Sequence, residues 1–133
     1  MSKKEVNNVW ADTATIPAGA GLYEALIVEP PTRYTSKKGE VCAMVRMELV
    51  EYGSDDGIIY THTDYVRGIS NILHVKDNLS KFFGKKFKDA GEVFAYAMEN
   101  RFLVNITENG PWLNCRYYHT RPEELEEPET RVF

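Results

Sequence analysis

The clearest alternation of hydrophobic and polar positions in the chain runs from residue 41 to residue 50. Apolar side chains at every second position are typical of a strand with one buried face. Residues 21–29 carry apolar side chains on both faces of a strand, and residues 58–66 are rich in β-branched and aromatic residues. Pro30-Pro31 ends the segment 21–29, and the turn-forming residues 53–57 join the segments 41–50 and 58–66. We expect these three strands to form a meander.

The hydrophobic period changes after residue 68. Apolar residues then recur at helical spacing up to residue 83, and Gly84 stands where a helix would end. Asp89 and Glu92 have the spacing of an N-terminal capping box, which predicts a second short helix. Residues 101–119 predict two strands joined by the turn Glu-Asn-Gly-Pro.

The order of these elements indicates the fold class. We expect a mainly β protein with one or two helices, in the order three strands, helix, two strands. This is the order of a five-stranded, OB-fold-like Greek-key barrel, a fold that binds oligonucleotides or oligosaccharides across its second and third strands and the adjacent loops. An open sheet packed on one helix, ferredoxin-like or cystatin-like, is the alternative.

Composition divides the chain into three parts. Residues 1–20 predict an N-terminal arm, residues 21–120 an OB-like domain, and residues 121–133 a flexible acidic tail. The chain has 20 acidic residues and 16 Lys and Arg residues. Five of the acidic residues and two of the basic residues lie in the tail, which leaves 15 acidic and 14 basic residues before it. The body is therefore nearly neutral, and it can bind nucleic acid only if its basic residues cluster.

Several classes of protein are disfavoured by the sequence. The chain has two cysteines, Cys42 and Cys115, and neither a signal peptide nor a run of about 20 apolar residues, which indicates a soluble protein of the reducing cytoplasm. No Gly-rich phosphate loop or nucleophile signature is present. His62-Thr63-Asp64 lacks a third ligand at metal-binding spacing. We expect no enzyme, no metal and no other cofactor.

Binding residues are better represented than catalytic ones. The loop between the first two predicted strands combines cations with an aromatic ring, and single-stranded nucleic acid needs both: cations follow the phosphates and rings stack on unpaired bases. A polar loop that serves only solubility is the simpler interpretation, and it stays open. The predicted DNA-binding residues are Arg33, Tyr34, Lys37, Lys38, Arg46, Tyr60, His62, Arg67, Trp112, Arg116 and Tyr118.

The segment "EELEEPETRVF" at residues 123–133 needs a separate explanation. An acidic tail can occupy a basic groove until DNA displaces it, a competition that salt weakens. An aromatic residue after the glutamates gives a partner protein an apolar anchor. The predicted partner-binding residues are Glu126, Glu127, Glu129 and Phe133.

This segment resembles the tails of bacterial and phage single-stranded DNA-binding proteins, which are acidic, end in phenylalanine and recruit replication and repair proteins. It departs from the bacterial pattern because Thr130-Arg131-Val132, not Ile-Pro, stands before Phe133. Residues 21–118 are similar to the short phage-encoded OB-fold members of that class, in "GLYEALIVE", "TSKKGE", "MELVEY" and "WLNCRYY". The resemblance implies sequence-indifferent binding of single-stranded DNA in phage DNA replication or recombination, in the host cytoplasm.

A rival from another class is a small protein-binding module that inhibits or recruits a host protein. The net charge of −4 favours it, because an acidic surface can mimic nucleic acid. A carbohydrate-binding module is a third interpretation. Exposed strand edges favour a homodimer in each case.

Overall fold

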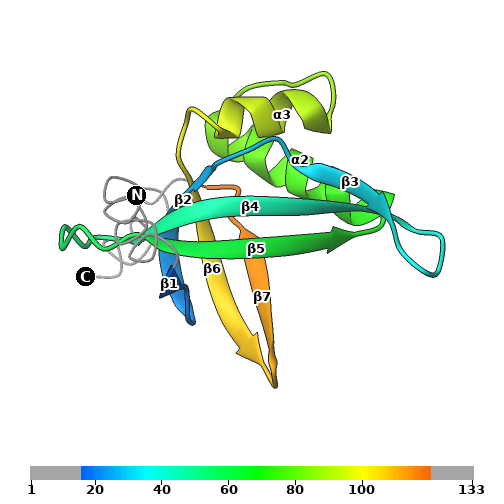
Figure 1. Cartoon of the computed structure of the whole chain (residues 1–133). Coiled ribbons are helices and arrows are strands. Elements are labelled where there is room, and N and C mark those ends of the chain that lie inside the picture. Colours follow the sequence, from blue (N-terminus) through cyan, green and yellow to red (C-terminus); the bar gives the residue numbers. More distant parts are fainter. Residues whose placement is uncertain (1–15, 121–133) are drawn as a thin grey trace, which may run out of the picture.

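The computed structural model describes residues 16–120, which form one sheet and two helices (Figure 1). The strands are β1 (Ile16–Pro17), β2 (Gly21–Ile27), β3 (Thr32–Thr35), β4 (Val41–Glu51), β5 (Tyr60–Arg67), β6 (Phe102–Asn109) and β7 (Trp112–Tyr117), and the helices are α2 (Ile69–Phe83) and α3 (Ala90–Ala97). The prediction of a mainly β protein with one or two helices is confirmed. Neither of these two helices is long and apolar enough to span a membrane.

The sheet is a curled, open half-barrel. Its strand order is β1-β5-β4-β2-β6-β7, and β3 pairs with β4. After β5 the chain passes through α2 and α3 and returns as β6 on the free side of β2. The spatial order β6-β2-β4-β5 is that of a Greek key. In Figure 1 the two helices lie together on one side of the sheet, above β4.

The structure has seven strands where the sequence predicted five, and the strand order differs from the predicted one. β1 lies in the segment predicted as an arm and pairs in parallel with β5, where Ile16 is opposite Tyr60. β3 lies in the segment predicted as a loop and pairs with the first half of β4. β2 and β3 both pair with β4. Pro30-Pro31 separates the two strands, because proline has no N–H to donate to the ladder.

The core lies on the inner face of the half-barrel, where α2 packs against it. Burial alternates along β4 and follows helical spacing along α2, as the sequence predicted. The core side chains from these two elements include Ala43, Val45, Met47, Leu49, Val75, Leu79, Phe82 and Phe83.

Both predicted helix-end signals are confirmed. Gly84 follows α2 with a φ of 67°, in the left-handed region that glycine adopts without steric cost. At the start of α3, the Asp89 carboxylate accepts a hydrogen bond of 2.9 Å from the Glu92 N–H. The Glu92 carboxylate accepts one of 2.6 Å from the Lys88 N–H. The first bond satisfies a backbone donor that the first turn of a helix leaves unpaired, and the second ties the residue before the cap to that turn.

One side-chain hydrogen bond joins β5 to β7, which have no backbone ladder between them. The Tyr117 hydroxyl donates to the Asp64 Oδ2 over 2.7 Å. The Tyr117 ring is buried and stacks on Phe102 at a centroid distance of 6.0 Å. Burial raises the pKa of Asp64, while the hydrogen bonds from the Tyr117 hydroxyl and the Tyr65 N–H lower it. Burial also raises the pKa of Tyr117. We call the line between β5 and β7 the seam.

Replacing Tyr117 by Phe tests the contribution of this bond. The variant leaves a half-buried Asp64 oxygen without its hydroxyl donor, so we expect the free energy of unfolding to fall by about 1–3 kcal/mol at neutral pH. Urea denaturation followed by circular dichroism measures it. Tyr65→Phe is the matched control, because the Tyr65 side chain is 56% exposed, and its stability should stay within about 0.5 kcal/mol of the wild type. Equal stability of Tyr117→Phe and wild type would contradict this role.

Candidate functional site

A groove of about 600 Å³ runs along the seam between β5 and the tip of the β6–β7 hairpin. We call it the seam groove. Its lining residues are Tyr34, Thr63, Asp64, Tyr65, Arg67, Trp112, Leu113, Asn114 and Cys115.

A second groove of about 620 Å³ continues the first one between β5, β7 and α2. We call it the helix groove. Asp64, Tyr65, Arg67 and Cys115 line both grooves, so the two are continuous. A separate pocket of about 510 Å³ lies between β3, β4 and the two helices, and its lining is mainly apolar.

Strand register explains which side chains reach the seam groove. Tyr34 lies opposite Cys42, and Cys42 lies opposite Arg67. Residues directly opposite one another share a face of the sheet, so Tyr34 and Arg67 point to the same side. Tyr65 points to that side as well, because it is two residues from Arg67 on β5. This side is the outer face, since the alternate residues of β4 face the core.

The aromatic residues of the seam groove are unusually exposed. The side chain of Trp112 is 72% exposed and that of Tyr65 is 56% exposed, while Tyr34 is half-buried. Exposed rings that gather in one groove mark an interaction surface more often than isolated ones do. Their faces are available for stacking.

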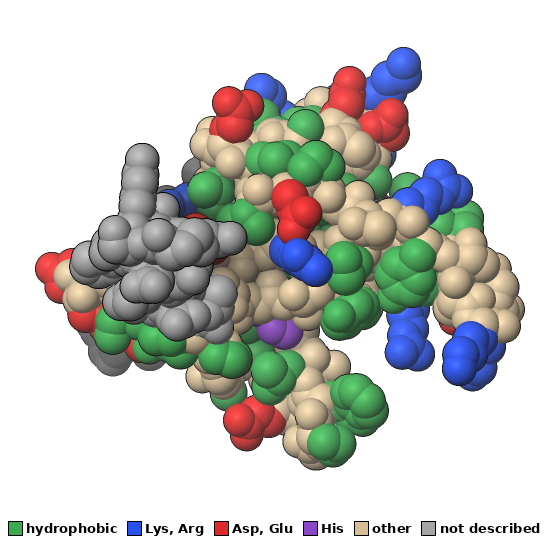
Figure 2. All heavy atoms as spheres, viewed as in Figure 1, with side chains coloured by type: hydrophobic (Ala, Val, Ile, Leu, Met, Phe, Trp, Pro, Cys, Tyr) green, Lys and Arg blue, Asp and Glu red, His purple; other side chains and the backbone are tan. Residues whose placement is uncertain are grey.

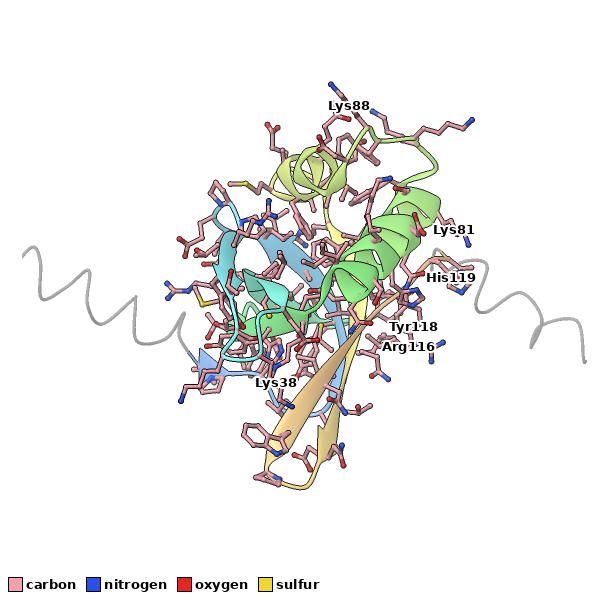
Figure 3. The ribbon with its side chains drawn as sticks, turned by 90° about the vertical axis from the view of Figure 1, so that its right-hand side faces the viewer. Lys38, Lys81, Lys88, Arg116, Tyr118 and His119 are labelled. Atoms are coloured by element: carbon pink, nitrogen blue, oxygen red, sulfur yellow. The ribbon has the colours of Figure 1, made fainter. Side chains whose placement is uncertain are left out.

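The charge around the seam groove is mostly positive. Arg67 lines it, and Lys37 and Lys38 are exposed on the loop between β3 and β4. Figure 2 shows Lys and Arg side chains projecting from this end of the molecule, and Figure 3 shows Lys38 there. Asp64 is the one acidic residue among those that line the groove, and its carboxylate is held by Tyr117.

Acidic residues gather at the other end of β4. Glu51, Asp55 and Asp56 lie at or beside the turn that leads to β5, whereas Lys37 and Lys38 precede the start of β4. The nearly neutral body therefore separates its charges along one long strand. A polyanion is attracted to one end and repelled by the other.

The structure brings together four of the predicted DNA-binding residues and leaves three, Lys37, Lys38 and Tyr118, beside them. Tyr34, Arg67 and Trp112 line the seam groove, and Arg116 lines the helix groove. The Arg116 guanidinium lies over the ring of Tyr118 at 5.7 Å. The lysines of the β3–β4 loop, Lys37 and Lys38, lie near the groove without lining it.

Four predicted residues lie elsewhere. Tyr60 and His62 are on the inner face of β5: Tyr60 packs edge-on against Tyr23 at 5.8 Å, and His62 lies opposite Met47. Arg33 points to the other side of β3 from Tyr34 and lines the apolar pocket.

Arg46 is the fourth of these residues. Arg46 is on the outer face but forms an exposed ion pair with Glu29 at 3.2 Å. Glu126, Glu127, Glu129 and Phe133 lie outside the described residues.

Tyr65 is the groove residue that the sequence interpretation missed. The sequence did contain a signal for Tyr65. Residues two apart on a strand share a face, so Tyr65 lies on the same face as Arg67, whereas Tyr60 and His62 lie on the opposite face. Leu113 and Asn114 were also missed, and their signal was proximity to Trp112 at the hairpin tip.

No protein-family model matches the chain, and no curated protein matches it in sequence. Within residues 16–120, no three His, Cys, Asp or Glu side chains gather as a metal site would require. Aromatic rings and cations are the chemical groups that the described residues bring to the seam groove.

His62 makes the stability of the protein depend on pH. Burial lowers the pKa of His62 below its ordinary value of 6.5, and its Nε2 has no hydrogen-bond partner among the described residues. The unfolded chain binds the proton more readily. The stability contributed by neutral His62 is therefore present above that ordinary value and is lost as the pH falls through it toward the folded pKa.

We expect the free energy of unfolding of the wild type to fall between about pH 7.5 and pH 5.5, and that of His62→Leu to fall less. Urea denaturation at each pH measures both. His119→Gln is the control, because His119 is exposed, and it should keep the wild-type pH dependence. Parallel pH profiles for wild type and His62→Leu would contradict the assignment.

Proposed function

We propose that the protein binds single-stranded DNA without sequence preference and has no catalytic role. One observation carries the proposal: the exposed rings of Tyr65 and Trp112 share a groove with the Arg67 guanidinium. Every unpaired base has a face that can stack on an aromatic ring, and every nucleotide has a phosphate that attracts a cation. This pairing of groups therefore suits a strand of any sequence.

The same groups favour a single strand over a duplex. In a duplex the base faces are already stacked on their neighbours, so rings such as Trp112 could reach them only after unpairing. The groove offers three aromatic residues, Tyr34, Tyr65 and Trp112, for stacking, and the carboxylate of its one acid, Asp64, already accepts a hydrogen bond from Tyr117. Stacking by itself gives little sequence discrimination.

The topology supports an OB-like assignment for the domain. The five longer strands include a Greek key closed by a long helical connection, and their outer face carries the groove. OB-folds bind oligonucleotides on their second and third strands and on the loops after the first and fourth. In this chain those positions correspond to β4, β5, the loop with Lys37 and Lys38, and the β6–β7 turn.

The resemblance to phage single-stranded DNA-binding proteins suggests a role in DNA replication or recombination. In that role, residues 121–133 would recruit partner proteins through Glu126, Glu127, Glu129 and Phe133. The Lys37 and Lys38 end of the body is the surface that an acidic tail would occupy in the absence of DNA.

Trp112→Ala tests the stacking role. The loss of one stacked base costs about 1–3 kcal/mol, so we expect the dissociation constant for oligo-dT to rise about 5- to 150-fold. Anisotropy of a labelled oligonucleotide measures it at low and at physiological salt. In a Trp10→Phe background Trp112 is the remaining tryptophan, and its fluorescence should be quenched by oligo-dT and not by duplex of the same length.

Tyr52→Ala is the aromatic control, because Tyr52 follows the far end of β4, outside both grooves. It should bind like the wild type. An equal loss in both variants, or no oligo-dT binding by the wild type at low salt, would contradict the proposal.

Removal of residues 123–133 tests the tail. We expect the truncated chain to fold normally and to bind oligo-dT more tightly at low salt, with a smaller gain at high salt, because an intramolecular anion has been removed. The full-length chain with its five tail glutamates changed to glutamine should behave alike. Unchanged low-salt affinity in both would show that the tail does not compete.

The acidic end of the body favours one second candidate, a protein-binding module. The turn before β5 combines Asp55 and Asp56 with the exposed side chains of Ile58 and Ile59. Such a surface suits a partner with basic and apolar groups. Neutralising Asp55 and Asp56 would weaken that partner's binding and would leave oligo-dT binding intact.

A further inference from the structure

One face of α2 carries a row of polar side chains beside β7. Asn71, His74 and Asn78 are spaced three and four residues apart, so they lie on one face, and all three line the helix groove. Lys81 continues the row by a further three residues. The adjoining face of α2 is buried in the core through Val75, Leu79 and Phe82. The polar row is therefore one side of the helix that stays open to a ligand.

Two hydrogen bonds fix this face of α2 against the strands. The Asn78 amide donates to the Tyr117 carbonyl oxygen over 3.0 Å. The Asn71 amide donates to the Arg67 carbonyl oxygen over 2.7 Å. These bonds hold α2 beside the ends of β5 and β7, so the groove between them has a defined shape.

The side chains that remain in the helix groove are donors of hydrogen bonds. Arg67, His74, Arg116 and His119 line it, from β5, α2, β7 and the residues after β7. Among residues 16–120, none of these four side chains has an ion pair or a hydrogen-bond partner. The single acid in the lining, Asp64, is the carboxylate bound by Tyr117.

The labelled side chains agree with this arrangement. Figure 3 shows Arg116, Tyr118, His119 and Lys81 on the same side of the molecule, along α2, with Lys88 away from them. A concave site with two guanidinium groups, two imidazoles and no available carboxylate is suited to an anion.

We infer that the helix groove is a phosphate-binding subsite, in which Arg67, His74, Arg116 and His119 hold phosphate groups of the strand whose bases stack in the seam groove. This inference rests on the proposed function and extends its binding path from β5 and the hairpin tip to α2. Arg67 lines both grooves, so its guanidinium is the group that a strand lying in the two grooves would meet in each.

A carboxylate-rich protein segment is the other anion that such a groove could take. Phosphate is favoured because the groove is continuous with the aromatic seam groove, which an acidic segment would leave unused. Phosphate also offers several oxygens to planar guanidinium groups at once, and two arginines, Arg67 and Arg116, line this groove.

The first test is the salt dependence of oligo-dT binding by Arg116→Gln. Loss of one phosphate contact on a single strand lowers the slope of log K against log salt by about 0.7. Arg101→Gln is the matched control: Arg101 pairs with Glu24 at 3.3 Å and lines neither groove, so its slope should equal that of the wild type. An unchanged slope for Arg116→Gln would overturn the inference while leaving the proposed function in place.

The second test uses inorganic phosphate and does not depend on strand binding. The chain has three histidines, and His62 is the internal reference because it lies on the inner face of β5, outside both grooves. We expect phosphate, at ionic strength matched with NaCl, to shift the NMR imidazole signals of His74 and His119 and to leave those of His62 in place. Equal effects of phosphate and NaCl would overturn the subsite.

Two further outcomes separate the alternatives. If phosphate moves His74 and His119 but the wild type binds no oligo-dT, the subsite stands and the proposed function fails. If poly-glutamate moves them and phosphate does not, the groove accepts an acidic protein segment, and the inference is wrong.

Discussion

The open half-barrel depends on the hydrogen bond between Tyr117 and Asp64. β5 and β7 lie at the two sides of the seam without a backbone ladder, and this bond of 2.7 Å joins them through side chains. Strand parity places Asp64 on the inner face of β5, opposite Val45, so its carboxylate meets Tyr117 there, while Tyr65 and Arg67 lie on the outer face. The half-buried acid is costly to ionise, and the hydrogen bond from the Tyr117 hydroxyl offsets part of that cost.

Much of the fold was predictable because it follows from local chemistry. Alternating burial along β4, the glycine after α2 and the Asp89–Glu92 capping box are each encoded within a few residues. β1 and β3 were not predictable in this way. Each is short, and each becomes a strand only because a distant segment, β5 or β4, offers it a pairing edge.

The candidate site was predictable only in part. The sequence named cations and aromatic rings of the loop, β5 and β7, and several of them lie together in the structure, but the side of the strand on which each one points was not considered. Tyr60 and His62 lie at even-numbered positions of β5 and Arg67 at an odd-numbered one. Because side chains alternate along a strand, they point to opposite faces of the sheet. Tyr34, Cys42 and Arg67 lie side by side on β3, β4 and β5. Predicting this row requires the pairing register of the three strands, which a single sequence does not contain.

Pro30 and Pro31 also affect how the molecule behaves in a crowded solution. They lie between β2 and β3, which both pair with β4. Without this interruption β2 and β3 would continue as one long strand. A long unbroken edge of N–H and C=O groups is a template for pairing with another chain and hence for aggregation. Two residues without N–H groups shorten that template, so the bend that shapes the sheet also protects it from self-association.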